Sequence, residues 1–189
     1  MDIHQLIQNR RSVYPEMFTG ASIEADVLMK ILENANFAPT HKLTEPWRFR
    51  IIAGDKRAAL GEILSNWYKE NTKEADFSEM KYNKMKTRAG KSSHVVAICM
   101  QRDAKERVPE WEELAATSMA VQNIWLSAWD LGVGMYWGSI KAIHSEAIQQ
   151  FLALGEGETC LGFLYMGMRP EGLELKAVRT PIADKIKWL

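Results

Sequence analysis

Three short segments of the sequence hold side chains whose types and spacing could do chemistry. The first is Arg10-Arg11-Ser12, which places two guanidinium groups beside a hydroxyl. Guanidinium groups bind phosphate oxygens through paired, charge-assisted hydrogen bonds, so this cluster could hold the phosphate of a ligand. Arginine is also favoured at the end of a helix by the helix dipole, and a solvated pair of arginines is the simpler alternative.

The second segment is the loop from residue 38 to residue 47, which reads Ala-Pro-Thr-His-Lys-Leu-Thr-Glu-Pro-Trp. Turn chemistry accounts for its prolines. It does not account for His41, Lys42 and Glu45, which lie between them. A stiff loop that bears a histidine, a lysine and a carboxylate is suited to contacting a ligand.

The third segment is Gly134-Met135-Tyr136-Trp137-Gly138-Ser139. Glycine within a strand lets a ligand or another backbone approach closely. A bulge or a tight bend is the simpler alternative for this segment taken alone.

Motifs of several other enzyme classes are missing. Gly132, Gly134 and Gly138 lack the spacing of a dinucleotide fingerprint, and they lead from a helix into a strand instead of the reverse. The sequence has no P-loop, no HExxH, no CxxC and no Gly-x-Ser-x-Gly elbow. We therefore expect no metal site and no nucleophilic side chain of the hydrolase type.

The composition gives no reason to expect some classes of partner, and with other features of the sequence it favours the cytoplasm. Lysine and arginine number 24, as do aspartate and glutamate, so no net charge favours nucleic acid or an anionic membrane. The start of the chain does not resemble a signal peptide, and no apolar run is long enough to cross a bilayer. Cys99 and Cys160 lie in apolar runs and are expected to be buried free thiols.

The elements that must position these segments form one predicted domain over residues 1–189. Apolar periodicity predicts helices that start after Asp2, Ser22 and Gly54, a long helix over 110–131 and a shorter one over 145–154. Strands are predicted over 47–53, 94–100, 134–139 and 159–168. Residues 69–91 are lysine-rich and predict a mobile helical excursion. Alternating helices and strands favour a sheet with helices on both faces.

Two features indicate a second copy of the chain. The helix over 110–131 is apolar around most of its circumference, so it must be buried on most sides. The tail that follows Gly172 has no amphipathic pattern of its own and must lie on something else.

Taken together and in this order, the three segments and Gly162-Phe163-Leu164-Tyr165-Met166-Gly167 resemble the nitroreductase family, specifically its short members. The resemblance covers nearly the whole chain. It implies an α+β fold, a three-layer α-β-α sandwich with a mixed sheet, and a homodimer that binds FMN between its subunits. Because the tail, about residues 173–189, lacks a helix or strand pattern that could close on itself, we also expect it to wrap the partner subunit.

The resemblance further implies which residues bind FMN. Arg10 and Ser12 fall where the family holds the phosphate and the ribityl chain, and Arg11 belongs to the same motif. A basic residue late in the chain often completes the phosphate site. Arg179 is the first candidate for that residue and Arg169 the second.

Other residues fall at family positions near the flavin ring. His41 lies in the loop that reaches the flavin of the partner subunit, and Lys42 completes a His-Lys pair common in the short subgroup. Phe37 occupies a flavin-contacting position, and Trp137-Gly138-Ser139 lie on the segment whose backbone runs against the ring.

Two segments depart from the family pattern. Many members carry Asn-x-Gln-Pro-Trp where this chain has Leu43-Thr44-Glu45-Pro46-Trp47, so an amide that would bond the ring edge is missing. Close relatives have a third arginine where this chain has Gly138, which opens space or removes a charge near the ring. Both departures bear on ring orientation and redox potential.

The resemblance implies an enzyme that passes hydride from NADPH or NADH through flavin N5 to a nitroaromatic, a quinone or a similar electron-poor acceptor. The alternatives are another FMN enzyme on the same fold, such as an enone reductase, a flavin reductase or a dehalogenase, and a non-catalytic flavin-binding or redox-sensing dimer. Nothing in the sequence selects NADPH over NADH.

Overall fold

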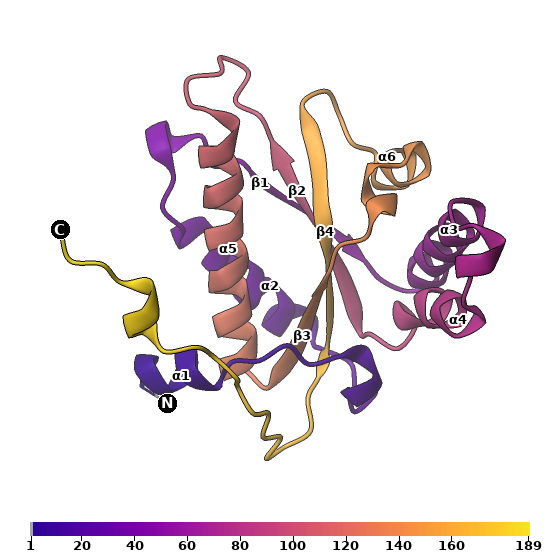
Figure 1. The fold of residues 1–189 in the computed structure, drawn as a ribbon, viewed down its shortest axis with the longest axis horizontal. Coiled ribbons are helices and arrows are strands. Elements are labelled where there is room, and N and C mark those ends of the chain that lie inside the picture. The colour runs from indigo at the N-terminus through magenta and orange to yellow at the C-terminus, as the bar shows by residue number, and fades with distance from the viewer. Residues whose placement is uncertain (1) are drawn as a thin grey trace.

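A computed structural model describes residues 2–189, which form a four-stranded sheet with helices on both faces (Figure 1). The strands are β1 (Trp47–Ile52), β2 (His94–Gln101), β3 (Val133–Gly138) and β4 (Glu158–Met168). Their order is β1-β2-β4-β3. The predicted α+β fold and its three layers are confirmed.

The sheet is antiparallel between every pair of neighbouring strands, so the prediction of a mixed sheet is wrong for this chain. Within residues 2–189, the parallel pairing is a single isolated bridge between Ser12 and Met135. Alternating helix and strand patterns do not fix strand direction, because that depends on which strands become neighbours.

One face of the sheet is covered by α2 (Ala25–Glu33) and α5 (Glu110–Asp130), with α1 (Ile3–Asn9) packed on α5. The other face is covered by α3 (Lys56–Glu70) and α6 (Glu146–Leu152). Strand β2 is buried on both faces: Val96 and Ile98 face the α5 side, whereas Val95, Ala97 and Cys99 face the α3 side. This double burial explains its nearly continuous apolar run.

Two local predictions about helix starts have opposite outcomes. Asp2 caps α1, since its side chain accepts a hydrogen bond from the amide of Gln5 over 3.0 Å. Ser22 does not cap α2, which begins after Glu24. The amide of Ile23 instead donates to the hydroxyl of Ser93 over 2.8 Å, which ties this part of the chain to the segment before β2 and delays the helix.

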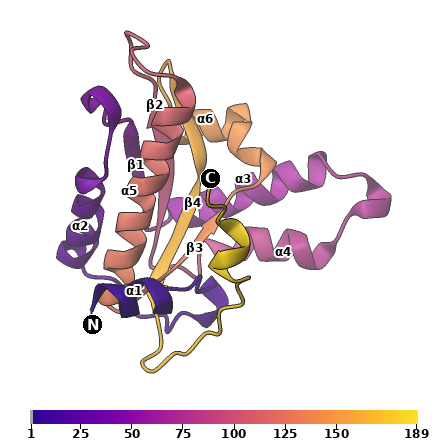
Figure 2. The ribbon, with the colours of Figure 1, turned by 60° about the vertical axis from the view of Figure 1, so that its left-hand side comes forward.

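The excursion between α3 and β2 is helical, as predicted. It contains α4 (Glu79–Arg88), which packs on α3 and projects away from the sheet with it (Figure 2). No residue of α4 is buried. The prediction that this segment is mobile stays a prediction.

The long helix α5 buries one side against the sheet and leaves apolar side chains on the other. Ala120, Ile124 and other small or branched residues are buried. Trp111, Leu114 and Met119 remain 67%, 43% and 41% exposed. The expected burial on most sides is therefore not reached within one chain.

Three further features concern the cysteines, the C-terminal tail and the length of the helices. Cys99 and Cys160 are free and buried, as expected, and face each other across β2 and β4. The tail beyond residue 172 holds one short 3-10 helix, Ile182–Lys185, and is largely exposed. No helix of residues 2–189 is long and apolar enough to span a membrane.

Candidate functional site

The segment that follows α1 is fixed against the sheet by backbone hydrogen bonds. The amide of Arg10 donates to the carbonyl of Leu6 over 3.0 Å and closes α1. Ser12 then bridges to Met135, and the amide of Val13 donates to the Met135 carbonyl over 2.8 Å. The arginine-serine cluster thus lies beside β3 on a backbone held by its neighbours.

A cavity of about 330 Å³ lies beside this cluster, and part of the C-terminal tail forms its opposite wall. Its lining residues are Arg10, Arg11, Ser12, Tyr14, Met17, Leu175, Lys176 and Arg179. The structure therefore brings the predicted binding residue Arg179 to the arginine-serine cluster at residues 10–12, from which it is far in the sequence. We call Arg10, Arg11, Ser12, Lys176 and Arg179 the basic cradle.

The electrostatics of the basic cradle favour an anion. Burial lowers the pKa of Arg10, and the charges of Arg11 and Arg179 lower it further. The Nε atoms of Arg10 and Arg11 are buried without a hydrogen-bond partner. A buried donor without a partner costs about 1–3 kcal/mol, and a bound phosphate would satisfy such donors while neutralising the clustered charge. The cradle thus fits a phosphate group.

Two tryptophans of α5 support arginines beside the cradle. The guanidinium carbon of Arg10 lies 4.7 Å from the ring centre of Trp125, and that of Arg169 lies 4.4 Å from the ring centre of Trp129. Such stacking orients a guanidinium group without neutralising it.

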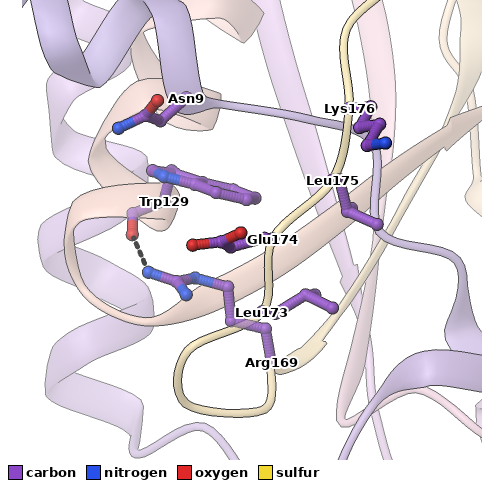
Figure 3. Close-up of a pocket in the computed structure, with 7 residues that line it drawn as sticks. All are labelled: Asn9, Trp129, Arg169, Leu173, Glu174, Leu175 and Lys176. Carbon is purple, nitrogen blue, oxygen red and sulfur yellow. Dashed lines mark hydrogen bonds between the residues drawn. The ribbon is translucent and has the colours of Figure 1, made fainter.

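Arg169 has a different role from Arg179. Its Nη2 donates to the carbonyl of Trp129 over 3.3 Å, at the C-terminal end of α5 (Figure 3). It lines a neighbouring cavity of about 360 Å³, which Figure 3 shows between α5 and the tail. Arg179 lines the cradle itself. Of the two late basic candidates, Arg179 therefore lies in the cradle and Arg169 lies beside it.

The loop over residues 38–47, which we call the histidine loop, lies at the N-terminal end of α5, opposite the end that carries Trp125 and Trp129. His41 Nδ1 is 2.5 Å from Glu112 Oε2, in the first turn of that helix. Lys42 Nζ donates to the carbonyl of Arg107 over 2.9 Å. His41 also lines a cavity of about 370 Å³ with Trp111 and Met119.

These two parts of the predicted site are not brought together within one chain. Arg10 lies on Trp125 and His41 on Glu112, and these partners are separated by more than three turns of α5. At 1.5 Å per residue, the two parts are roughly 20 Å apart along the helix. Phe37 is exposed and lines a fourth cavity, so it joins neither part.

The predicted ring-binding segment is packed more tightly than its glycine suggests. A Cβ atom at Gly138 would lie 3.0 Å from the ring of Tyr165 and 3.2 Å from that of Tyr136. Of the two expectations for Gly138, the opening of space is wrong, because two tyrosine rings lie within 3.2 Å of that Cβ position. The removal of a charge stays a prediction. Trp137 donates from Nε1 to the carbonyl of Leu161 over 3.3 Å, and Ser139 is exposed.

The fold and this geometry can be compared with known proteins. Residues 7–168 match the profile of the Nitroreductase family. The chain belongs to the nitroreductase family. The match covers the arginine-serine cluster, the histidine loop and the whole sheet.

Relatives of this family span the full length of the chain. The chain is 31% identical over 184 residues to YfhC of Bacillus subtilis strain 168, a protein provisionally named NAD(P)H nitroreductase, with 97% of this chain and 92% of that protein covered. A nitroreductase-like family protein from Bacillus cereus is 29% identical with a TM-score of 0.81, and the match covers 100% and 96% of the two chains. A nitroreductase-type protein from Desulfovibrio desulfuricans, solved in complex with FMN, shares the fold at 21% identity and a TM-score of 0.75, with 98% and 95% covered.

The sequence did not indicate several residues that lie at the basic cradle, at the histidine loop and beside Gly138. Tyr14 and Lys176 line the basic cradle, and Glu112 pairs with His41. Arg88 of α4 lies over the rings of Tyr136 and Tyr165, at 5.0 and 5.8 Å from their centres. Acidic residues are favoured in the first turn of any helix, so the sequence gives no signal that singles out Glu112.

Proposed function

We propose that the chain is an FMN-dependent oxidoreductase that uses NADPH or NADH to reduce nitroaromatics, quinones or similar electron-poor acceptors. The observation that carries this proposal is the basic cradle, with its buried, unpartnered arginine donors. Family membership and the names of its relatives support the same assignment.

In this proposal, the cradle residues hold the phosphate end of FMN. Arg10, Arg11 and Arg179 donate to the phosphate oxygens, and Ser12 donates from its hydroxyl to the phosphate or the ribityl chain. Trp125 keeps Arg10 turned toward the cavity. Bidentate donation from guanidinium groups gives orientation as well as affinity.

Bound FMN would supply the redox chemistry, accepting hydride from the nicotinamide and passing it to the acceptor. The chain's own residues bind and orient the reactants. We assign Trp137, Gly138 and Ser139 to the wall beside the flavin ring. Phe37, His41 and Lys42 are assigned to contacts made from the partner subunit.

We also propose a homodimer. The exposed Trp111, Leu114 and Met119 on α5 favour a second copy as their cover. The separation of His41 from the cradle within one chain favours a site completed by two chains. We infer that the tail, about residues 173–189, packs on the partner subunit, because its Ile186, Trp188 and Leu189 are exposed.

The absorption spectrum of the purified protein tests the cofactor. Flavin bands in the visible region that disappear on dialysis against denaturant are expected, and their absence after reconstitution with FMN would contradict the proposal. Oxidation of NADPH in the presence of a nitro acceptor separates an enzyme from a non-catalytic flavin-binding dimer. A screen with enones, free flavins and halogenated aromatics separates the other FMN enzymes of this fold.

The cytoplasmic location stays a prediction.

A further inference from the structure

The contact between His41 and Glu112 links the histidine loop to the first turn of α5. The two atoms, Nδ1 and Oε2, are 2.5 Å apart, and the side chains are 58% and 22% exposed. The histidine is thus open to a ligand, whereas the carboxylate lies behind it. An ionised carboxylate only accepts hydrogen bonds, so Nδ1 of His41 must carry the hydrogen.

The loop that presents His41 is held from several directions. Lys42 and Leu43 have φ values of 51° and 53°, a left-handed conformation that side chains rarely adopt. Such a conformation persists when surrounding contacts fix it. Here the contacts include Lys42 Nζ to the carbonyl of Arg107 and the amide of Glu45 to the hydroxyl of Thr40, at 2.9 and 3.1 Å.

The arginines near Glu112 are paired with other carboxylates, so the Glu112 carboxylate pairs with His41. Glu113, in the same turn, accepts from Arg102 and from the amide of Asp103, so it belongs to a buried structural pair. Arg107 donates from Nε to Asp103 over 2.8 Å. The nearby guanidinium groups are thereby engaged with other carboxylates.

We propose that Glu112 is a positioning residue that fixes the Nδ1–H tautomer of His41 and leaves Nε2 as the nitrogen available to the flavin. This inference rests on the proposed function, in which His41 contacts FMN. A histidine whose one ring nitrogen is held by a carboxylate has a defined ring orientation at its other nitrogen. Glu112 itself does not touch the ligand.

The first test measures the tautomer directly, without flavin. Nitrogen-15 NMR of histidine-labelled protein, above the pH at which His41 is protonated, should find the hydrogen on Nδ1 in the wild type. Glu112→Gln should keep it there, because the amide oxygen still accepts a hydrogen bond. Glu112→Ala should move the hydrogen to Nε2. An unchanged tautomer in Glu112→Ala would overturn the proposal.

The second test measures FMN affinity by fluorescence titration of the dimer. Glu112→Ala should weaken binding about three- to tenfold, as expected for the loss of one oriented hydrogen bond, and Glu112→Gln should restore most of it. In a double-mutant cycle, Glu112→Ala should add nothing to His41→Ala, because Glu112 acts only through the histidine. Full additivity would overturn the proposal.

Glu110→Gln is the matched control, because Glu110 is an exposed carboxylate in the same helical turn. It should leave both the tautomer and the FMN affinity unchanged. An effect of Glu110→Gln equal to that of Glu112→Ala would assign the change to the helix dipole and contradict the proposal. Failure of the wild type to bind FMN would refute the proposed function, whereas the flavin-free tautomer measurement would still decide the role of Glu112.

Discussion

Arg10 is oriented by its surroundings before any ligand binds. Its guanidinium lies over Trp125, and its Nε has no hydrogen-bond partner. Burial lowers the pKa of Arg10, and the charges of Arg11 and Arg179 lower it further. We expect Arg10→Ala to lower FMN affinity at least about tenfold while the protein stays folded, since a charge-assisted pair contributes about 1.5–3 kcal/mol. Fluorescence titration measures the affinity. Arg169→Ala is the control, because Arg169 donates to the Trp129 carbonyl, and it should change FMN affinity much less. Equal losses in both variants would contradict the assignment of the cradle.

A second prediction at this scale concerns Gly162 of β4. It has φ 139°, and a Cβ atom there would approach Trp137 Nε1 to 2.4 Å and the carbonyl oxygen of Gly138 to 2.8 Å. Gly162→Ala should therefore lower the free energy of unfolding by at least about 2 kcal/mol, through backbone strain and overpacking together. Urea unfolding measures the loss. Gly20→Ala separates the two causes, because Gly20 has φ 87° but open space around it, and its cost should be smaller.

At the scale of elements, those with a clear apolar pattern of their own could be predicted from the sequence. Features that depend on contacts with distant residues could not. The apolar run of β2 and the long apolar helix α5 were recognisable because their patterns depend on their own residues. The antiparallel direction of the sheet and the late start of α2 were not, because both depend on partners distant in sequence, such as Ser93 for Ile23. The site shows the same division. The arginine-serine cluster is local, whereas the arrival of Lys176 and the pairing of Glu112 require the folded chain.

The helix α4 gives a prediction about motion. It has no buried residue, and its Lys81 and Lys84 lie 4.7 and 5.9 Å from the ring centres of Tyr68 and Tyr14. Its last residue, Arg88, lies over the rings of Tyr136 and Tyr165. Segments with few buried contacts open at low free-energy cost. Amide hydrogens of α4 should exchange much faster than those of β2, and a bound acceptor should slow them. Hydrogen exchange with mass spectrometry measures both rates, and protection of α4 equal to that of β2 would contradict the prediction.

At the scale of the whole molecule, several large apolar side chains are exposed. They include Trp111, Leu114 and Met119 on α5, and Trp188 and Leu189 at the end of the tail. Exposed apolar side chains gathered on one helix, as on α5, favour an interface. Obligate homodimer interfaces bury upwards of about 2,000 Å² and behave like a divided core, so we expect that the chain has no stable folded monomer.

Dilution tests this expectation, because an obligate dimer couples folding, association and flavin binding. Sedimentation at nanomolar concentration, with far-ultraviolet circular dichroism on the same sample, should show a dimer or a loss of structure together with released FMN. Met119→Glu places a charge in the proposed interface and should give aggregated or unfolded protein. Met80→Glu is the matched control, since Met80 is exposed on the projecting helix α4, and it should leave the dimer intact. A well-folded monomer that still holds FMN would contradict a site shared between two subunits, and it would remove His41 from the flavin contacts.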